Sequence, residues 1–358
     1  FGHEDIGITC ALIPKNTAGV RQGRRHDPLS TPFINSPING ENVEVDLDHV
    51  IGGQDGLGKG WKMLMECLAA GRGISLPSTS AGGSKLVARA VSAYSALRQQ
   101  FGTSIGKFEA VEEVLARMAG RTYTVEALRS FTAGAIDAGY KPAVITAIAK
   151  YHATEMFRQV INDGMDVMAG RAIIRGKRNM LANAYFSTPI SITVEGANIM
   201  TRGLIHFGQG AMMCHPYARK EVDALEKNDI HAFDSAFFAH IRHLLGNFAR
   251  SIILSLTRGY LACVPCGRSS HPIAAKYNRK IAWASATFAF LADLAMARFG
   301  GNLKRKEKLN GRFGDVLSAL YLSVCVLKKF EHDGYKKEDE LVVEYALKEE
   351  FDKAQIAI

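Results

Sequence analysis

The spacing of hydrophobic positions changes about sixty residues into the chain. Before that point, segments 6–13 and 43–47 favour β-strands, since the first is a run of apolar and small residues and the second alternates strictly between apolar and charged residues. Two or three strands do not make a stable sheet alone. We therefore expect a partial β-domain at the N-terminus, with its other strands preceding Phe1.

From Gly60 onward, apolar residues recur every three or four positions, which predicts amphipathic helices. A stretch containing Gly and Arg, 169–179, interrupts this pattern, and another helix is expected after Glu195. Long helices with short connections predict a bundle, so the fold class is mainly α. The helices are marked by the sets Trp61/Leu64/Leu68, Leu86/Ala90/Tyr94/Leu97, Phe108/Val111/Leu115/Met118 and Ile145/Ile148/Met156/Val160.

A boundary is predicted near His215-Pro216, because a proline there follows small and apolar residues. We expect the segment from Pro216 to Ile358 to pack as a separate helical module. Its middle apolar helix is about as long as a minimal membrane span, but Asp293 and Arg298 favour a helix packed in a bundle. The three apolar helices of this segment are predicted over 233–248, 281–299 and 313–330.

Composition narrows the classes of protein. Hydrophobic residues make up 47% and charged residues 22% of the 358 positions, which excludes a disordered or collagen-like chain. Six cysteines are too sparse for a disulfide framework and point to a reducing compartment. No signal-peptide pattern follows Phe1, and we expect the chain to begin inside a longer protein.

The net charge of +9 raises the question of nucleic-acid binding. The densest basic runs, 21–25 and 304–308, are not interleaved with aromatic residues that could stack on bases. The charge therefore favours an anionic small molecule over a nucleic acid. Peripheral contact of the run 304–308 with a membrane stays an open alternative.

Two motifs resemble a phosphate-binding loop and a zinc site, but the residues that normally accompany such sites are missing. Segment 56–60 is glycine-rich, yet it has neither the Rossmann spacing nor a Walker ending. Cys263 and Cys266 have the spacing of zinc ligands, with His271 nearby, but no matching fourth ligand is visible. We expect no metal site and treat both cysteines as ordinary residues at a helix end.

Glu195 is a lone carboxylate with apolar residues on both sides, where a helix could begin. Such a residue can be a helix N-terminal charge, which is the more common case. It can also be a general base, since an apolar setting suits proton abstraction. The residue alone does not decide between these two hypotheses.

Three segments in order resemble the acyl-CoA dehydrogenase family: 98–102 (Arg-Gln-Gln-Phe-Gly), 166–170 (Asp-Val-Met-Ala-Gly) and 195–197 (Glu-Gly-Ala). The resemblance covers residues 1 to about 215, and the section after Pro216 is similar to the helical extension of large bacterial members. It divides the chain into the end of a middle β-domain over 1–55, a C-terminal helical bundle over 56–215 and the extension over 216–358.

The resemblance implies an FAD-dependent enzyme that oxidises acyl-CoA to trans-2-enoyl-CoA in fatty-acid β-oxidation, with Glu195 as the catalytic base. Electrons would pass to an electron-transfer flavoprotein. The resemblance also implies a homo-oligomer, with the neighbouring subunit's flavin bound in part by Arg98, and a cytoplasmic protein near the inner face of the membrane. Arg72 and Gly196 would contact substrate. The implied flavin contacts are Arg98, Phe101, Gly102, Asp166, Gly170, Ala197 and Asn198.

This sequence departs from the family at three of its flavin positions. Asp166 stands where the family has Gln, Ala169 where it has Gly, and Ala197 where it has Thr. These departures leave a second hypothesis open, in which the chain is a non-catalytic helical fragment that binds acyl-CoA or drives oligomerisation. A flavin band in the purified protein would separate the two hypotheses.

Overall fold

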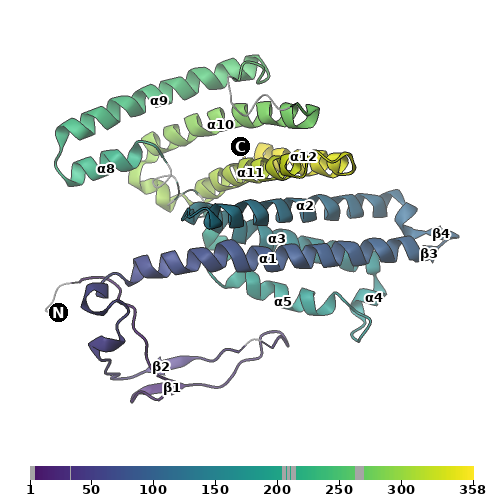
Figure 1. Cartoon of the computed structure of the whole chain (residues 1–358), viewed down its shortest axis with the longest axis horizontal. Helices are drawn as coiled ribbons and strands as arrows, with labels where there is room; N and C mark the ends of the chain where they lie inside the picture. Colours follow the sequence, from purple (N-terminus) through teal and green to yellow (C-terminus); the bar gives the residue numbers. More distant parts are fainter. Residues whose placement is uncertain (1–4, 33, 204–206, 208–209, 211–214, 263–269) are drawn as a thin grey trace.

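The computed structural model describes residues 5–32, 34–203, 207, 210, 215–262 and 270–358. Long helices lie in stacked layers, and the N-terminal segment lies apart from them below α1 (Figure 1). The first layers are α1 (Gly60–Leu97), α2 (Glu109–Asp137) and α3 (Ala143–Met168), which pack against one another. Shorter helices follow, namely α4 (Gly170–Ile173), α5 (Ala182–Thr193) and α6 (Asn198–Met200).

The second half of the chain continues the stack. Helices α11 (Glu307–His332) and α12 (Glu340–Ala357) lie on α2, and α8 (Ala218–Glu226), α9 (Ile230–Leu256) and α10 (Pro272–Phe299) complete the outer layers (Figure 1). Helices α8 and α12 were not predicted. Single 3-10 turns join elements at Leu47–His49, Gly53–Gly56, Ile105–Lys107, Gly300–Arg305 and Lys337–Asp339.

The strands are not where the alternation placed them. The antiparallel pair is β1 (Val20–Gln22) and β2 (Ile38–Gly40), while segment 6–13 contributes only a bridge from Ala11 to Val50. Segment 43–47 forms no strand, because the chain turns into the 3-10 turn that begins at Leu47. The remaining strands, β3 (Gln99–Gln100) and β4 (Thr103–Ser104), form a small hairpin after α1.

Helix α1 is one continuous element, where the apolar sets indicated two. It contains Pro77 without ending there. The change of apolar face along its 38 residues reflects different neighbours, since its later part packs on α3 through Ala81, Val87 and Val91. Pro142 is the N-cap of α3, close to the helix start predicted for it.

The expectation of a separately packed module after Pro216 is wrong. One hydrophobic core joins Val125 and Leu128 of α2 with Leu322 and Phe330 of α11 and with Leu347 of α12. Ion pairs cross the same seam, with Arg121 Nη2 3.0 Å from Glu349 Oε1 and Arg202 bonded to both carboxylate oxygens of Asp315. The two halves therefore share a core, because α2 is apolar on both of its faces.

Within the described part of the chain, one helix, α10 with the turn after it (Pro272–Arg305), is long and apolar enough to cross a membrane. Its Asp293 is buried against His215, with Oδ1 2.9 Å from Nε2. A carboxyl group buried among packed helices is consistent with α10 as a helix of the bundle. Whether α10 contacts or crosses a membrane is not tested by the fold.

Candidate functional site

The chain makes a strained turn directly after α5. Helix α5 ends at Thr193, and then Glu195 and Gly196 both have positive φ, 55° and 96°. A non-glycine residue in this region costs about 1–3 kcal/mol and is concentrated at functional sites. The turn directs the Glu195 side chain back toward α1.

The Glu195 carboxylate lies against α1 at Gly71 and Arg72. A Cβ at Gly71 would stand 3.0 Å from Glu195 Oε1, so the missing side chain makes room for the carboxylate. Arg72 is only 6% exposed; burial lowers its pKa, and the nearby Glu195 charge opposes that shift. Among the described residues, Glu195 Oε2 is buried without a hydrogen-bond partner, so this oxygen is free to accept a proton.

Lys150 of α3 is hydrogen-bonded to the backbone of this turn. Its side chain is fully buried, and its Nζ donates to the carbonyl oxygens of Ile192 and Gly196 at 2.9 Å and to Asn198 Oδ1 at 2.7 Å. Burial and the charge of Arg72 lower its pKa to about 8, against the raising effect of Glu195. One ammonium thus fixes the chain on both sides of Glu195.

Asn198 extends the same network. Its Nδ2 donates to Thr154 Oγ1 at 3.1 Å and to Glu155 Oε1 at 2.8 Å. Both ends of its amide are bonded within the bundle, so the side chain fixes the backbone just after Gly196, and the flavin contact expected of Asn198 stays a prediction. Ala197 beside it is exposed.

The sequence reasoning missed Lys150 altogether. A signal was present, because a lysine interrupts the apolar run of α3 on a face where Ala147 and Ala153 are buried. A lysine on a core-facing position needs partners inside the protein. Its partners come from a turn more than forty residues later, which periodicity does not reveal.

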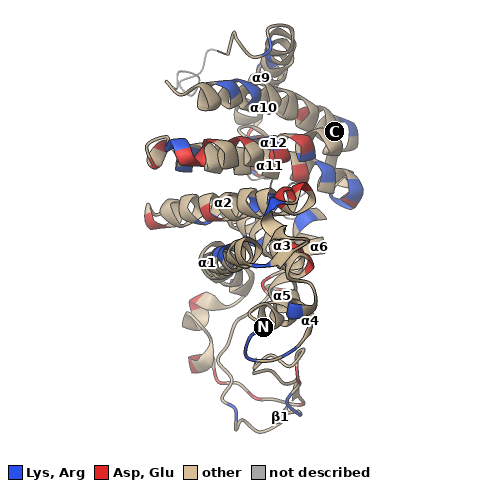
Figure 2. Cartoon of the chain, turned by 90° about the vertical axis from the view of Figure 1, so that its right-hand side faces the viewer, with Lys and Arg blue, Asp and Glu red and all other residues tan. Residues whose placement is uncertain are grey.

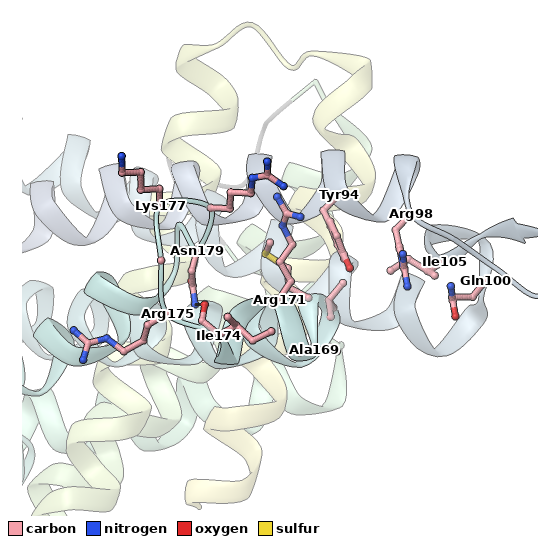
Figure 3. A pocket seen from close by; sticks show the side chains of 15 residues that line it. Tyr94, Arg98, Gln100, Ile105, Ala169, Arg171, Ile174, Arg175, Lys177 and Asn179 are labelled. Atoms are coloured by element: carbon pink, nitrogen blue, oxygen red, sulfur yellow. Dashed lines mark hydrogen bonds between the residues drawn. The ribbon is translucent and has the colours of Figure 1, made fainter.

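A second feature is an open pocket of about 800 Å³ beside the end of α1. Figure 3 shows Tyr94, Arg98 and Gln100 on one side of it and Arg171 and Ile174 on the other. No acidic residue is among its lining residues, and the guanidinium of Arg171 lies 5.9 Å from the centre of the Tyr94 ring. The cationic lining residues are Arg98, Arg171, Arg175, Lys177 and Arg178. This excess of positive charge suits a ligand with several negative charges.

The structure brings together only some of the predicted flavin residues. Arg98 and Gly170 both line the pocket. Phe101 and Gly102 form the exposed tip of the hairpin after α1, with φ of 52° and 79°, and do not line it. Asp166 is exposed on α3 and also lies outside the lining. The pocket gains instead the three cations of 175–178, which the sequence reasoning did not select.

A cluster of His215, His243 and Asp293 has donor atoms within 4.8 Å of one another. His215 Nδ1 accepts the backbone N–H groups of Tyr217 and Ala218, so its proton is on Nε2, which faces Asp293. A metal on Nε2 would require the loss of that proton. The arrangement therefore favours a close polar contact between α10 and the segment just before α8 over a metal site. Cys263 and Cys266 lie outside the described residues.

Two family models match the chain. The model described as acyl-CoA dehydrogenase, C-terminal domain, covers residues 58–208, and the model described as acyl-CoA dehydrogenase, C-terminal, bacterial type, covers residues 212–358. Together they span both helical halves. The Glu195 turn lies within the first match.

Curated relatives match parts of the chain. A stretch of 91 residues is 54% identical to the protein HemX of Proteus mirabilis, covering 25% of this chain and 54% of that protein. Over 171 residues the chain is 29% identical to the mitochondrial very long-chain specific acyl-CoA dehydrogenase of mouse, covering 47% of this chain and 25% of that one. The chain thus spans about half or less of the length of these relatives.

The fold also matches a solved structure. It superposes on an acyl-CoA dehydrogenase from Bacillus anthracis, crystallised with FAD, with a TM-score of 0.70 and 17% sequence identity. The match covers 98% of this chain and 58% of that one. At this identity the likeness establishes the shared fold, including the helices after Pro216.

Proposed function

Because this chain belongs to the acyl-CoA dehydrogenase family, we propose that it catalyses the FAD-dependent oxidation of an acyl-CoA thioester to the trans-2-enoyl-CoA. The observation that carries the proposal is the buried, unpartnered Glu195 Oε2 on a strained turn. A carboxylate oxygen that is fixed in place and free of hydrogen bonds is suited to accept a proton from carbon.

The proposed chemistry assigns the α-proton of the substrate to Glu195 Oε2. The thioester oxygen gains negative charge as this proton leaves and needs a donor, which we assign to the backbone N–H of Glu195. Arg72 places a buried guanidinium close to the Glu195 carboxylate. Gly196 follows directly, and its φ of 96° is a backbone conformation that favours glycine over other residues.

The basic pocket fits the pyrophosphate of FAD. Its cations include Arg98, Arg171 and Arg175, it has no acidic lining residue, and Tyr94 offers an aromatic face. Guanidinium groups bind phosphate oxygens with two parallel hydrogen bonds, which suits arginine to this ligand. When bound, FAD would supply the acceptor for the hydride from the substrate's β-carbon. Gly170 lets the backbone come close to the ligand.

We extend the proposal to the setting of the reaction. Fatty-acid β-oxidation would use the enoyl-CoA product, an electron-transfer flavoprotein would take the electrons, and medium- to long-chain substrates are expected. Arg98 lies at the exposed end of α1, which supports a flavin shared with a second subunit in a homo-oligomer. The proposed location is the cytoplasm, at the inner face of the membrane.

The test is the spectrum of the purified protein after incubation with FAD and dialysis. A retained flavin band that bleaches when an acyl-CoA is added without oxygen supports the dehydrogenase. The competing hypothesis, a non-catalytic helical protein that binds acyl-CoA or drives oligomerisation, predicts acyl-CoA binding by calorimetry with no bleaching. That second result would overturn the proposal.

A further inference from the structure

Between Asp234 and Asp293 the chain has no acidic residue, although this stretch contains seven Lys and Arg. It comprises most of α9 and α10, which form an antiparallel hairpin. Trp283 Nε1 of α10 donates to Ser255 Oγ of α9 at 2.7 Å, and the rings of Phe248 and Phe290 lie 5.0 Å apart. A long helical hairpin with one sign of charge is unusual for a surface that faces only water.

One side of α9 packs on the molecule and the other is apolar and exposed. Ala236, Asn247 and Leu254 are buried on the inner side. The outer side carries Phe238 and Leu245, 66% and 60% exposed, seven residues apart. Ile252 and Leu256 continue the same stripe, and Leu256 is 82% exposed. Apolar side chains in a continuous exposed stripe mark an interaction surface.

The position of the hairpin leaves this stripe accessible. Helix α9 is the outermost helix of the stack, on the far side of α10 from α11 and α12 (Figure 1). Figure 2 shows Lys and Arg on the hairpin, whereas α11 and α12 carry both acidic and basic residues. The exposed apolar residues of α9 and the positive charge of the hairpin thus lie at the same edge of the molecule.

We propose that the outer face of the α9–α10 hairpin binds an anionic lipid surface. Peripheral membrane helices combine an apolar face, which enters the boundary of headgroups and acyl chains, with Lys and Arg that bind anionic headgroups. Here Phe238, Leu245 and Leu256 supply the apolar face, and Arg242 and Arg250 of the same helix are exposed and supply the charge.

Charge decides between a lipid surface and a second copy of this chain. In a symmetric contact through α9, the Arg242 and Arg250 side chains of both copies would outnumber the two Asp234 carboxylates, so positive charge would remain unbalanced in the contact. Like charges across an interface are unfavourable, whereas anionic headgroups neutralise them. This surface differs from the basic run 304–308 considered from the sequence, because that run lacks an apolar stripe.

The test is flotation of the purified protein with two kinds of vesicle, phosphatidylcholine alone and phosphatidylcholine mixed with phosphatidylglycerol. Binding to the mixed vesicles, with weakening at high salt, is the expected result. The Leu245→Ser/Leu256→Ser and Arg242→Glu/Arg250→Glu variants should each bind at least ~10-fold more weakly. Leu341→Ser on α12 is the matched control, since Leu341 is equally exposed on another face, and it should bind as the wild type does.

Three results would overturn the proposal. Equal binding to both vesicles, or none, would remove the anionic surface as the partner. A change of oligomeric state in the α9 variants, by light scattering, without loss of vesicle binding would identify a second copy as the occupant. Retention in the membrane pellet after a carbonate wash would indicate that α10 spans the bilayer. The inference rests on the membrane location proposed above and names the surface that would make the contact. The assay reads no catalytic activity, so its failure is distinguishable from failure of the dehydrogenase proposal.

Discussion

The Glu195 turn and the Arg98 pocket lie in the same helical bundle and differ in how their charges are balanced. At the turn, Lys150 has three partners within the chain, and Arg72 faces Glu195. In the pocket, none of the five cationic lining residues has an acidic neighbour in the lining. The first site is therefore organised before any ligand arrives, whereas the second has charge that a ligand must neutralise. We therefore assign the chemical step to the Glu195 turn and cofactor binding to the Arg98 pocket.

The largest effect is expected from Glu195→Gln. The amide keeps the size of the side chain and its hydrogen bonds but cannot accept the α-proton. We expect flavin reduction by an acyl-CoA to slow by at least ~10²–10⁴-fold, the usual scale for a positioned base. Anaerobic stopped-flow absorbance measures it. A helix N-terminal charge would instead cost about 0.3–1 kcal/mol of stability, with reduction nearly intact.

Lys150→Met removes the donors that fix the turn and should slow flavin reduction by about 10²-fold, because a small displacement of the base has effects of that size. The affinity for FAD should stay unchanged. Since the carbonyls of Ile192 and Gly196 lose their donor, unfolding by urea should show a loss of about 1–3 kcal/mol for each buried acceptor left unsatisfied.

A second, less disruptive variant keeps the test informative if Lys150→Met does not fold. Asn198→Ala removes one of the three Lys150 partners and should slow reduction less, by about tenfold, with a smaller loss of stability. If both variants reduced flavin at the wild-type rate while folded, Lys150 would have no positioning role.

Arg98→Ala addresses the pocket and should weaken FAD binding by about tenfold, the value of one charge-assisted hydrogen bond. Once saturated with FAD, the variant should be reduced at the wild-type rate. Equilibrium titration followed by fluorescence gives the affinity. Asp166→Ala is the matched control, because Asp166 lies outside the pocket lining and its loss should change the affinity by less than about twofold.

The pH dependence of the turn should be smaller still. The pKa of Lys150 is lowered to about 8, so the ammonium with three donors predominates below that pH. Above it the neutral amine has two donors for three acceptors, and the turn loosens. The reduction rate should therefore decline by a few fold as the pH rises through about 8, and Asp166→Ala should show the same decline. A flat profile in the folded wild type would contradict this explanation.

Local pattern predicted the long helices other than α12, and the place of Glu195, but not which elements pack against each other. The helices have a 3.6-residue period that is visible in any window, and the family motifs locate the turn. The strands were misplaced because the apolar run 6–13 has no paired neighbour in the described chain apart from the bridge at Ala11. Whether a run becomes a strand depends on pairing, which the sequence of one segment does not contain.

The shared core and Lys150 were missed for the same physical reason. Phe330 packs on α2, and Lys150 bonds a turn that follows α5, so each depends on residues distant in sequence. Asp166 was selected from its motif position, and its side chain is exposed outside the pocket lining; the flavin contact expected of it stays a prediction. Motif spacing places the backbone, and side-chain direction then depends on tertiary packing.

The most direct test of the separation between the two sites is one titration carried out on two variants. FAD is added to flavin-free Glu195→Gln and Arg98→Ala proteins, and an acyl-CoA follows without oxygen. We expect Glu195→Gln to bind FAD like the wild type and to stay yellow, and Arg98→Ala to bind FAD more weakly and to bleach at the normal rate once saturated. Loss of the same property in both variants, or normal bleaching of Glu195→Gln, would contradict the account.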